Sequence, residues 1–245
     1  MDESIKCLNQ VTFDEHSNDY LLRHAATPLR KYEEEFIEGP IIEIGCGQSA
    51  LLLDYANTDR EIYAIDNDQF QLDLLKKRVE KLEKKKIENW KFLNLTFPED
   101  IIPSNHYSVI ILSNILHFFN FKKNVEIGKI IDGLAMPGTL IYIAVHSTKF
   151  YGNNSSDPNR YQYFKHYFKL KDFDYIFPKQ QYLRVFTSEY EQGTSKATLK
   201  LIDTWLDRFY EQRGITDPET IELDKKEYLQ NINEAGIHLV LRKIR

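Results

Sequence analysis

An acid and two glycines stand close together near the start of the chain, in the run Ile41-Ile42-Glu43-Ile44-Gly45-Cys46-Gly47. The branched apolar residues around Glu43 are typical of a short buried strand. Gly45 and Gly47 end that strand, and the helix formers Ala50-Leu51-Leu52-Leu53 follow. Glycine lets a backbone approach a ligand closely, and the N–H groups at a helix N-terminus point toward it. This stretch predicts a cradle for a nucleotide-like ligand.

Two acids indicate which ligand the cradle takes. The run from Gly45 to Ala50 satisfies the dinucleotide-binding pattern, which alone is a weak signal. Glu43, at the carboxyl end of the strand, would repel a pyrophosphate and would suit a ligand that carries an ammonium group. Asp66 follows about twenty residues later, where it can accept hydrogen bonds from both hydroxyls of a ribose. The pair favours a cationic nucleoside and disfavours a nicotinamide oxidoreductase.

Composition limits the class of protein. The 245 residues carry a net charge of −5, which argues against a nucleic-acid partner held by bulk electrostatics. Two cysteines, Cys7 and Cys46, cannot form a disulfide framework and suit a reducing compartment. No apolar run has the length of a membrane span, and the first residues lack the basic start of a signal peptide. We therefore expect a cytoplasmic protein with no membrane partner.

Strands and helices are expected to alternate around the cradle. The strands are predicted at 41–44, 61–66, 90–95, 107–112 and 139–145, with helices at 49–57, 69–86 and 124–134. The strand at 107–112 is a nearly continuous apolar run, which is typical of a strand covered on both faces. The alternation predicts a doubly wound α/β domain with a mainly parallel sheet.

The regular alternation ends after His146. Residues 150–190 are crowded with aromatic side chains, which predict either a substrate cap, a partner-binding face or a small satellite core. A helix is expected between Gly193 and Gly214, another over 224–235, and a closing strand over 237–242. The segment 182–187 fits either a strand of the sheet or a hairpin within the insertion. Before the cradle, two short helices within 1–38 fit a lid or packing on the sheet edge.

Four ordered motifs resemble those of the class I S-adenosylmethionine-dependent methyltransferases. Glu43 to Gly47 looks like the first motif of that family, and Ile65-Asp66-Asn67 like its ribose-binding acid. The run 108–119 is similar to the family's fourth strand and following loop, and 134–140 to the turn before its fifth strand. The resemblance covers about residues 41–146. It implies a Rossmann-like, seven-stranded sheet over 39–148 and 215–245, an N-terminal helical lid over 1–38 and an insertion or substrate cap over 149–214.

The resemblance also implies a cofactor, S-adenosylmethionine, and its contacts. Glu43, Gly45, Cys46, Gly47 and Ser113 would flank its methionine part, and Asp66 would bind its ribose. The adenine side would be formed by Asn67, Leu95, Thr96 and Phe97. Ser49 replaces the family's third glycine, and Thr96 stands where an acid often binds the adenine amino group. These departures bear on cofactor affinity rather than on cofactor identity.

Two histidines are candidate general bases. His117 follows the fourth strand and is placed like the base of small-molecule O-methyltransferases, although Phe118 and Phe119 follow it here. His146 ends the fifth strand. A packing or capping role is the alternative for both histidines. No metal site is indicated.

The expected function is methyl transfer from S-adenosylmethionine to a nitrogen or oxygen atom of a small molecule. Candidate substrate contacts are Tyr20, His117, Phe150 and Tyr151. One alternative is a protein methyltransferase that docks its partner through the 150–190 aromatic segment; the other is a catalytically inactive S-adenosylmethionine-binding module. Methylation of adenine or cytosine in DNA is disfavoured because the segment 113–116 lacks the Asn/Asp-Pro-Pro-aromatic signature.

Overall fold

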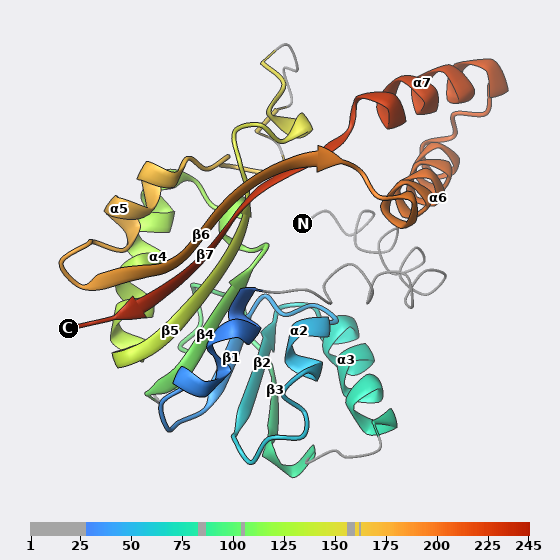
Figure 1. The fold of residues 1–245 in the computed structure, drawn as a ribbon. Helices are drawn as coiled ribbons and strands as arrows, with labels where there is room; N and C mark the ends of the chain where they lie inside the picture. Colours follow the sequence, from blue (N-terminus) through green and yellow to red (C-terminus); the bar gives the residue numbers. More distant parts are fainter. Residues whose placement is uncertain (1–27, 83–86, 104–105, 156–159, 162) are drawn as a thin grey trace.

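The computed structural model describes residues 28–82, 87–103, 106–155, 160–161 and 163–245 (Figure 1). Its centre is a seven-stranded sheet in the order β3-β2-β1-β4-β5-β7-β6. The strands are β1 (Ile41–Ile44), β2 (Ile62–Asp66), β3 (Trp90–Asn94), β4 (Tyr107–Ser113), β5 (Ala135–His146), β6 (Tyr182–Gly193) and β7 (Asn233–Lys243). The five strands from β1 to β5 pair in parallel, and β7 is antiparallel to both neighbours, β5 and β6. The doubly wound α/β fold is confirmed.

Helices cover both faces of the sheet. On one face, α4 (Phe121–Leu134) and α5 (Phe173–Ile176) pack on alternate residues of β1, β4, β5 and β7. On the opposite face, η1 (Pro28–Glu35), α2 (Ala50–Leu53) and α3 (Gln69–Lys81) pack on β1, β2 and β4. The near-continuous burial of β1 and β4 follows from this double cover. Short 3-10 turns complete the connections: η2 (Ile87–Asn89), η3 (Leu116–Phe118), η4 (Tyr151–Asn153) and η5 (Leu170–Asp172).

A helical hairpin connects β6 to β7. It consists of α6 (Lys196–Arg213) and α7 (Pro218–Asn231), and Figure 1 shows it projecting away from the sheet at the end of these two strands. Ser195 caps α6, and Gly214, at φ 67°, ends it. Helix α7 has no fully buried residue. None of the helices in the described part of the chain is long and apolar enough to cross a membrane.

The boundaries in the second half of the chain differ from those expected. The segment 149–214 was expected to be an insertion, but it contains β6, a strand of the central sheet. The hairpin between β6 and β7 instead spans the end of that segment and the start of 215–245. The helix expected over 224–235 ends at Asn231, because residues 233–236 pair with β6 and, at Gly236, with β5. Of the N-terminal lid, residues 1–27 lie outside the described part of the chain.

Two glycines of α4 provide a matched test of the helix packing. A Cβ at position 128 would lie 2.3 Å from the backbone carbonyl oxygen of Ile176, whereas a Cβ at position 133 would meet no atom within 4 Å. We expect Gly128→Ala to lower the free energy of unfolding by about 1–3 kcal/mol, because α5 cannot yield without moving its backbone. Gly133→Ala should raise it by up to about 1 kcal/mol through helix propensity. Urea unfolding measures both variants; a stabilised Gly128→Ala would contradict the described contact.

Candidate functional site

The glycine turn lies where the strand order reverses. Strand β1 is flanked by β2 on one side and β4 on the other, and ligands of open α/β sheets bind beyond the carboxyl ends of the strands at such a point. Gly45 and Gly47 have φ values of 68° and 49°, which glycine adopts without strain. A Cβ at Gly47 would meet no atom within 4 Å, so the turn faces open space. This open cradle is the expected binding position.

Glu43 is buried beneath the turn, at 3% exposure. The Ser49 hydroxyl donates a hydrogen bond to its carboxylate, and the Ser49 Oγ accepts one from the Leu52 N–H at 3.0 Å as the N-cap of α2. Burial is the main reason that the pKa of Glu43 rises to about 8; the Ser49 bond opposes this rise. Across the described residues no Lys or Arg forms an ion pair with Glu43. A bound ammonium group would supply the missing cation.

Asp66 connects the end of β2 to the turn. Its Oδ2 accepts a hydrogen bond from Gly47 N–H at 2.8 Å, and its Oδ1 accepts one from Asp68 N–H at 2.9 Å. Burial raises its pKa, while these backbone donors lower it. Cys46 donates its backbone N–H to Ile65 at 2.9 Å, and burial holds the pKa of its thiol well above the usual range. The thiol is therefore protonated and is not a nucleophile.

The expected adenine-side residues lie at the carboxyl ends of β2 and β3. These residues, Asn67, Leu95, Thr96 and Phe97, are not among the described residues that line the main cavity. Thr96 donates its backbone N–H to the Asp100 carboxylate at 2.7 Å. The Phe97 ring is buried in the core on the α4 side, edge-on to Phe119 with centroids 6.3 Å apart. Leu95 donates its backbone N–H to the Asp66 carbonyl at 3.0 Å.

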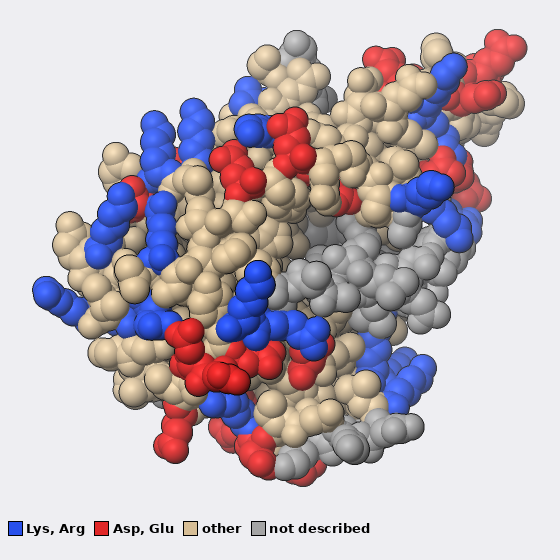
Figure 2. Space-filling model, viewed as in Figure 1, with Lys and Arg blue, Asp and Glu red and all other residues tan. Residues whose placement is uncertain are grey.

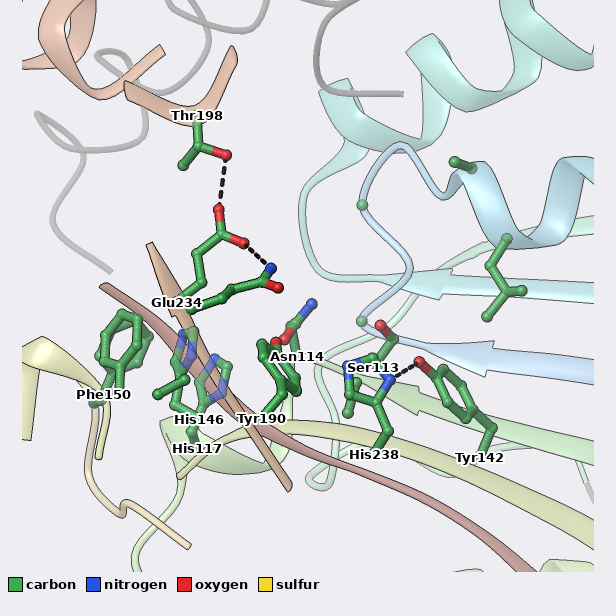
Figure 3. Close-up of a pocket in the computed structure, with 18 of the residues that line it drawn as sticks. Ser113, Asn114, His117, Tyr142, His146, Phe150, Tyr190, Thr198, Glu234 and His238 are labelled. Carbon is green, nitrogen blue, oxygen red and sulfur yellow. Dashed lines mark hydrogen bonds between the residues drawn. The ribbon is translucent and has the colours of Figure 1, made fainter. Parts of the chain in front are cut away.

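A cavity of about 990 Å³ extends from the glycine turn to the part of the sheet formed by β5, β7 and β6 (Figure 3). Near the turn it is lined by the expected residues Glu43, Gly45, Cys46, Gly47 and Ser113. Asn114 also lines it, with a φ of 58°, which is uncommon outside glycine. The expected substrate residues His117, Phe150 and Tyr151 line the other part, and Tyr20 lies outside the described residues.

Alternate residues of β5, β6 and β7 form the far wall of the cavity. Gly236 pairs with both His146 and Tyr190, and His238 pairs with both Ala144 and Ser188. Glu234 and Gln192 form the next pair along β7 and β6. Side chains two residues apart on a strand lie on the same face, so these residues share one surface. The missing side chain of Gly236 makes room for the Tyr190 side chain, since a Cβ at position 236 would lie 2.8 Å from the Tyr190 hydroxyl oxygen.

Sequence reasoning missed most residues of this wall. They are Tyr142, Ser188, Tyr190, Gln192, Glu234 and His238, all of which line the cavity. The available signal was the two-residue period of Phe186, Ser188, Tyr190 and Gln192. This period shows which residues share a face, but they can be placed in the cavity only when the pairing of β6 with β7 is known. The expected helix over 224–235 instead placed Glu234 outside the sheet.

Two histidines and a phenylalanine form a column of stacked rings. The His117 and His146 centroids are 4.3 Å apart, and those of His146 and Phe150 are 3.8 Å apart. Burial lowers the pKa of His146 to about 4 and that of His117 well below its usual value. Both rings are neutral near pH 7. The buried His117 Nδ1 has no hydrogen-bond partner within the described part of the chain. It can bond a ligand, but such a low pKa makes the ring a weak proton acceptor.

The cavity thus combines a cradle for a cationic nucleoside with a second, ring-lined compartment. Buried Glu43 can become a carboxylate when a cation binds beside it, and Gly47 leaves an open approach. Both features fit the ammonium-bearing part of S-adenosylmethionine. Asp66 is positioned beside the turn, where a ribose would be held. This arrangement can bring a methyl donor and an acceptor together, which is the main contribution that a methyl-transfer enzyme needs to make.

Comparison with known proteins finds methyltransferases. Residues 42–140 match the family model described as a methyltransferase domain. No curated protein matches the chain. The plantazolicin methyltransferase BpumL, solved in complex with SAH, is 15% identical, with a TM-score of 0.57 over 100% of this chain and 92% of its own.

Two further solved structures have the same fold. Coclaurine N-methyltransferase, bound to N-methylheliamine and SAH, is 13% identical, with a TM-score of 0.58 over 87% of this chain and 72% of its own. The [4+2]-cyclase SpnF is also 13% identical, with a TM-score of 0.56 over 86% and 77%. At such identities the likeness concerns the fold, which can host more than one chemistry. The family match covers the glycine turn, Asp66 and the strands that carry them. Residues 42–140 thus match a methyltransferase domain, and the chain as a whole has the fold of the solved methyltransferases described above.

Proposed function

We propose that this protein transfers a methyl group from S-adenosylmethionine to a nitrogen or oxygen atom of a small molecule. The observation that carries the proposal is the single cavity that joins the glycine turn to the wall of β5, β7 and β6. Its volume of about 990 Å³ lies at the upper end of the range for small-molecule sites. A cavity of that size suits a cofactor together with a compact acceptor.

The aromatic segment supports a small acceptor over a docked protein. Part of it, comprising Phe150, Tyr151, Tyr163 and Phe164, lines the cavity. Another part, comprising Phe168, Phe173, Phe177 and Tyr182, is buried in the core below α4 and α5. The rings are therefore divided between the cavity wall and the core. Tyr161 and Tyr175, with 51% and 66% exposure, are the more exposed members of the segment.

The charge distribution supports the same interpretation. On the face shown in Figure 2, basic side chains gather on the side of α4 and α5, acidic ones gather at the outer end of α7, and the two kinds are mixed elsewhere. The net charge is −5. A nucleic-acid substrate would be favoured by a basic stripe leading to the site.

Product analysis tests the proposed function. The purified protein is incubated with S-adenosylmethionine and a mixed panel of small amines, alcohols and carboxylic acids, and S-adenosylhomocysteine and methylated products are measured by mass spectrometry. A parallel incubation replaces the panel with protein extract. We expect turnover with the small molecules. Methylation confined to protein would favour the docking alternative, and cofactor binding without any turnover would favour an inactive module.

Asp66 provides the first test of the cofactor site. We expect Asp66→Asn to weaken S-adenosylhomocysteine binding roughly 10- to 100-fold, because hydrogen bonds from the ribose hydroxyls to a charged acceptor would become neutral ones. Isothermal titration calorimetry measures the affinity, with NAD as a second ligand. Asp73→Asn is the matched control, since it removes an equal charge from an exposed position on α3. Unchanged affinity in Asp66→Asn, or tight binding of NAD, would overturn the cofactor assignment.

Glu43 makes cofactor binding depend on pH. Its pKa of about 8 means that the side chain is largely protonated at pH 7, whereas an ammonium group beside it would favour the ionised form. Binding should therefore release a proton. Affinity should also rise by as much as about tenfold per pH unit between pH 6 and 8, and level off above the raised pKa.

Calorimetry in buffers of different ionisation enthalpy measures this release. We expect S-adenosylhomocysteine binding at pH 7 to show a buffer-dependent enthalpy that corresponds to nearly one proton. Glu43→Gln should abolish most of the dependence. Asp66→Asn serves as the comparison, because its acid also has a raised pKa. Equal enthalpies in all buffers for the wild type would show that the cofactor does not pair with Glu43.

A further inference from the structure

We call the part of the cavity that is lined by β5, β7 and β6 the acceptor compartment. Few charged side chains line the cavity. Its described lining contains two carboxylates, Glu43 and Glu234, and no Lys or Arg. Glu43 lies beneath the glycine turn, so Glu234 is the only charged side chain of the described residues on the β5-β7-β6 wall. An acceptor that carried a carboxylate or a phosphate would meet a negative charge without a compensating cation.

Glu234 is held in place by neutral donors. One carboxylate oxygen accepts a hydrogen bond from Thr198 Oγ1 at 2.9 Å, and the other accepts one from Gln192 Nε2 at 3.1 Å. Figure 3 shows both bonds, with the Glu234 side chain extending from β7 toward α6. No ion pair joins Glu234 to a Lys or Arg of the described chain. Each oxygen has a further lone pair, so the oriented carboxylate can still bind a cation.

Aromatic rings line the same wall of the cavity as Glu234. His146 and Tyr190 both pair with Gly236, which makes them the diagonal cross-strand neighbours of Glu234 on the same face. Such neighbours are within reach of long and aromatic side chains. Phe150 stacks on His146, and Phe164 meets both rings edge-on, with centroids 5.9 Å and 4.8 Å away. Aromatic faces attract cations within about 6 Å, especially when the cation has lost its water.

The histidines of the compartment do not oppose a cation. Burial lowers the pKa values of His117, His146 and His238, so all three rings are uncharged near neutral pH. The His238 Nδ1 is hydrogen-bonded to the Tyr142 hydroxyl at 2.8 Å. The compartment therefore combines one negative charge, aromatic faces and neutral imidazoles.

We propose that the methyl acceptor is a basic amine, which Glu234 and the rings of His146, Tyr190 and Phe150 bind and orient. This proposal rests on the proposed methyl-transfer function and specifies its substrate class. The amine reacts in its neutral form, having lost its proton to solvent. Its nitrogen lone pair forms the new N–C bond while the S–C bond breaks, and the electron pair of that bond stays on sulfur.

The compartment favours this reaction because its negative charge and aromatic faces stabilise the positive charge that develops on the nitrogen. Transfer to a neutral amine moves the positive charge from sulfur to nitrogen, and the product is an ammonium ion. The carboxylate of Glu234 and the aromatic faces therefore stabilise the nitrogen more as the reaction proceeds, which is the condition for catalysis. Transfer to an ionised hydroxyl would instead cancel the charge, and would require a base stronger than the neutral, low-pKa imidazole of His117.

Binding to the protein saturated with S-adenosylhomocysteine tests the proposal without turnover. The probes are three skeletons, ethyl chains that carry a phenyl, an indole or a cyclohexyl group, each ending in an amine, a hydroxyl or a carboxylate. Calorimetry at pH 7 should give at least one amine that binds about tenfold more tightly than its alcohol, with the carboxylate weakest. Equal affinities within every set, or no binding by any amine, would overturn the amine assignment.

The role of Glu234 is tested with a matched pair of variants. Glu234→Gln should weaken binding of the best amine about tenfold while leaving the affinity for the alcohol and for S-adenosylhomocysteine unchanged. Glu191→Gln removes an equal charge from the neighbouring position on β6, outside the cavity lining, and should change none of these affinities. Thermal unfolding verifies that both variants are folded. An amine affinity that is the same in Glu234→Gln and wild type would contradict the role of Glu234.

The outcomes separate this proposal from the function on which it rests. If S-adenosylhomocysteine does not bind, the methyl-transfer function itself fails. If it binds and the protein methylates alcohols or carboxylates rather than amines, the function stands and the amine assignment is wrong. If amines are bound selectively and are also methylated in the product analysis, both are supported.

Discussion

The pairing of β7 with both β5 and β6 is the interaction on which the cavity wall opposite the glycine turn depends. Backbone pairing with both neighbours brings residues that are distant in the sequence into common rows, such as His146, Gly236 and Tyr190. Because side chains alternate along a strand, a shift of one residue in either pairing would turn the whole wall to the opposite face. The chemistry of the compartment therefore follows from the register of three strands.

The donor side is organised by the parallel part of the sheet. Parallel pairing of β1 with β2 and β4 places the turn, Asp66 and Ser113 at one edge. There the fold maintains a buried acid, Glu43, whose desolvation is unfavourable when it is ionised. A cationic ligand would relieve that cost, so the site is better suited to its ligand than to water. The Ser49 hydroxyl connects the same acid to the start of α2.

The sequence sufficed for the donor side because its signals are local. The glycines and both acids lie between Glu43 and Asp66, and each buried run predicts its own strand without knowledge of its partners. The cavity wall opposite the turn was harder to predict from the sequence, because Glu234 and Tyr190 come together only when β6 and β7 are paired. Helix propensity favoured a helix up to 235, but tertiary pairing from Asn233 onward prevailed. The placement of Asn67, Thr96 and Phe97 relative to a cofactor stays a prediction.

The connection between β6 and β7 contributes to one part of the cavity and is separate in the chain from the glycine turn. The α6–α7 hairpin supplies Thr198, which orients Glu234, yet the turn between β1 and α2 belongs to the other half of the sheet. Thr198 therefore reaches the cavity from a connection outside the sheet, and a change in that connection would alter the hold on Glu234 without altering the strand pairing that positions the glycine turn.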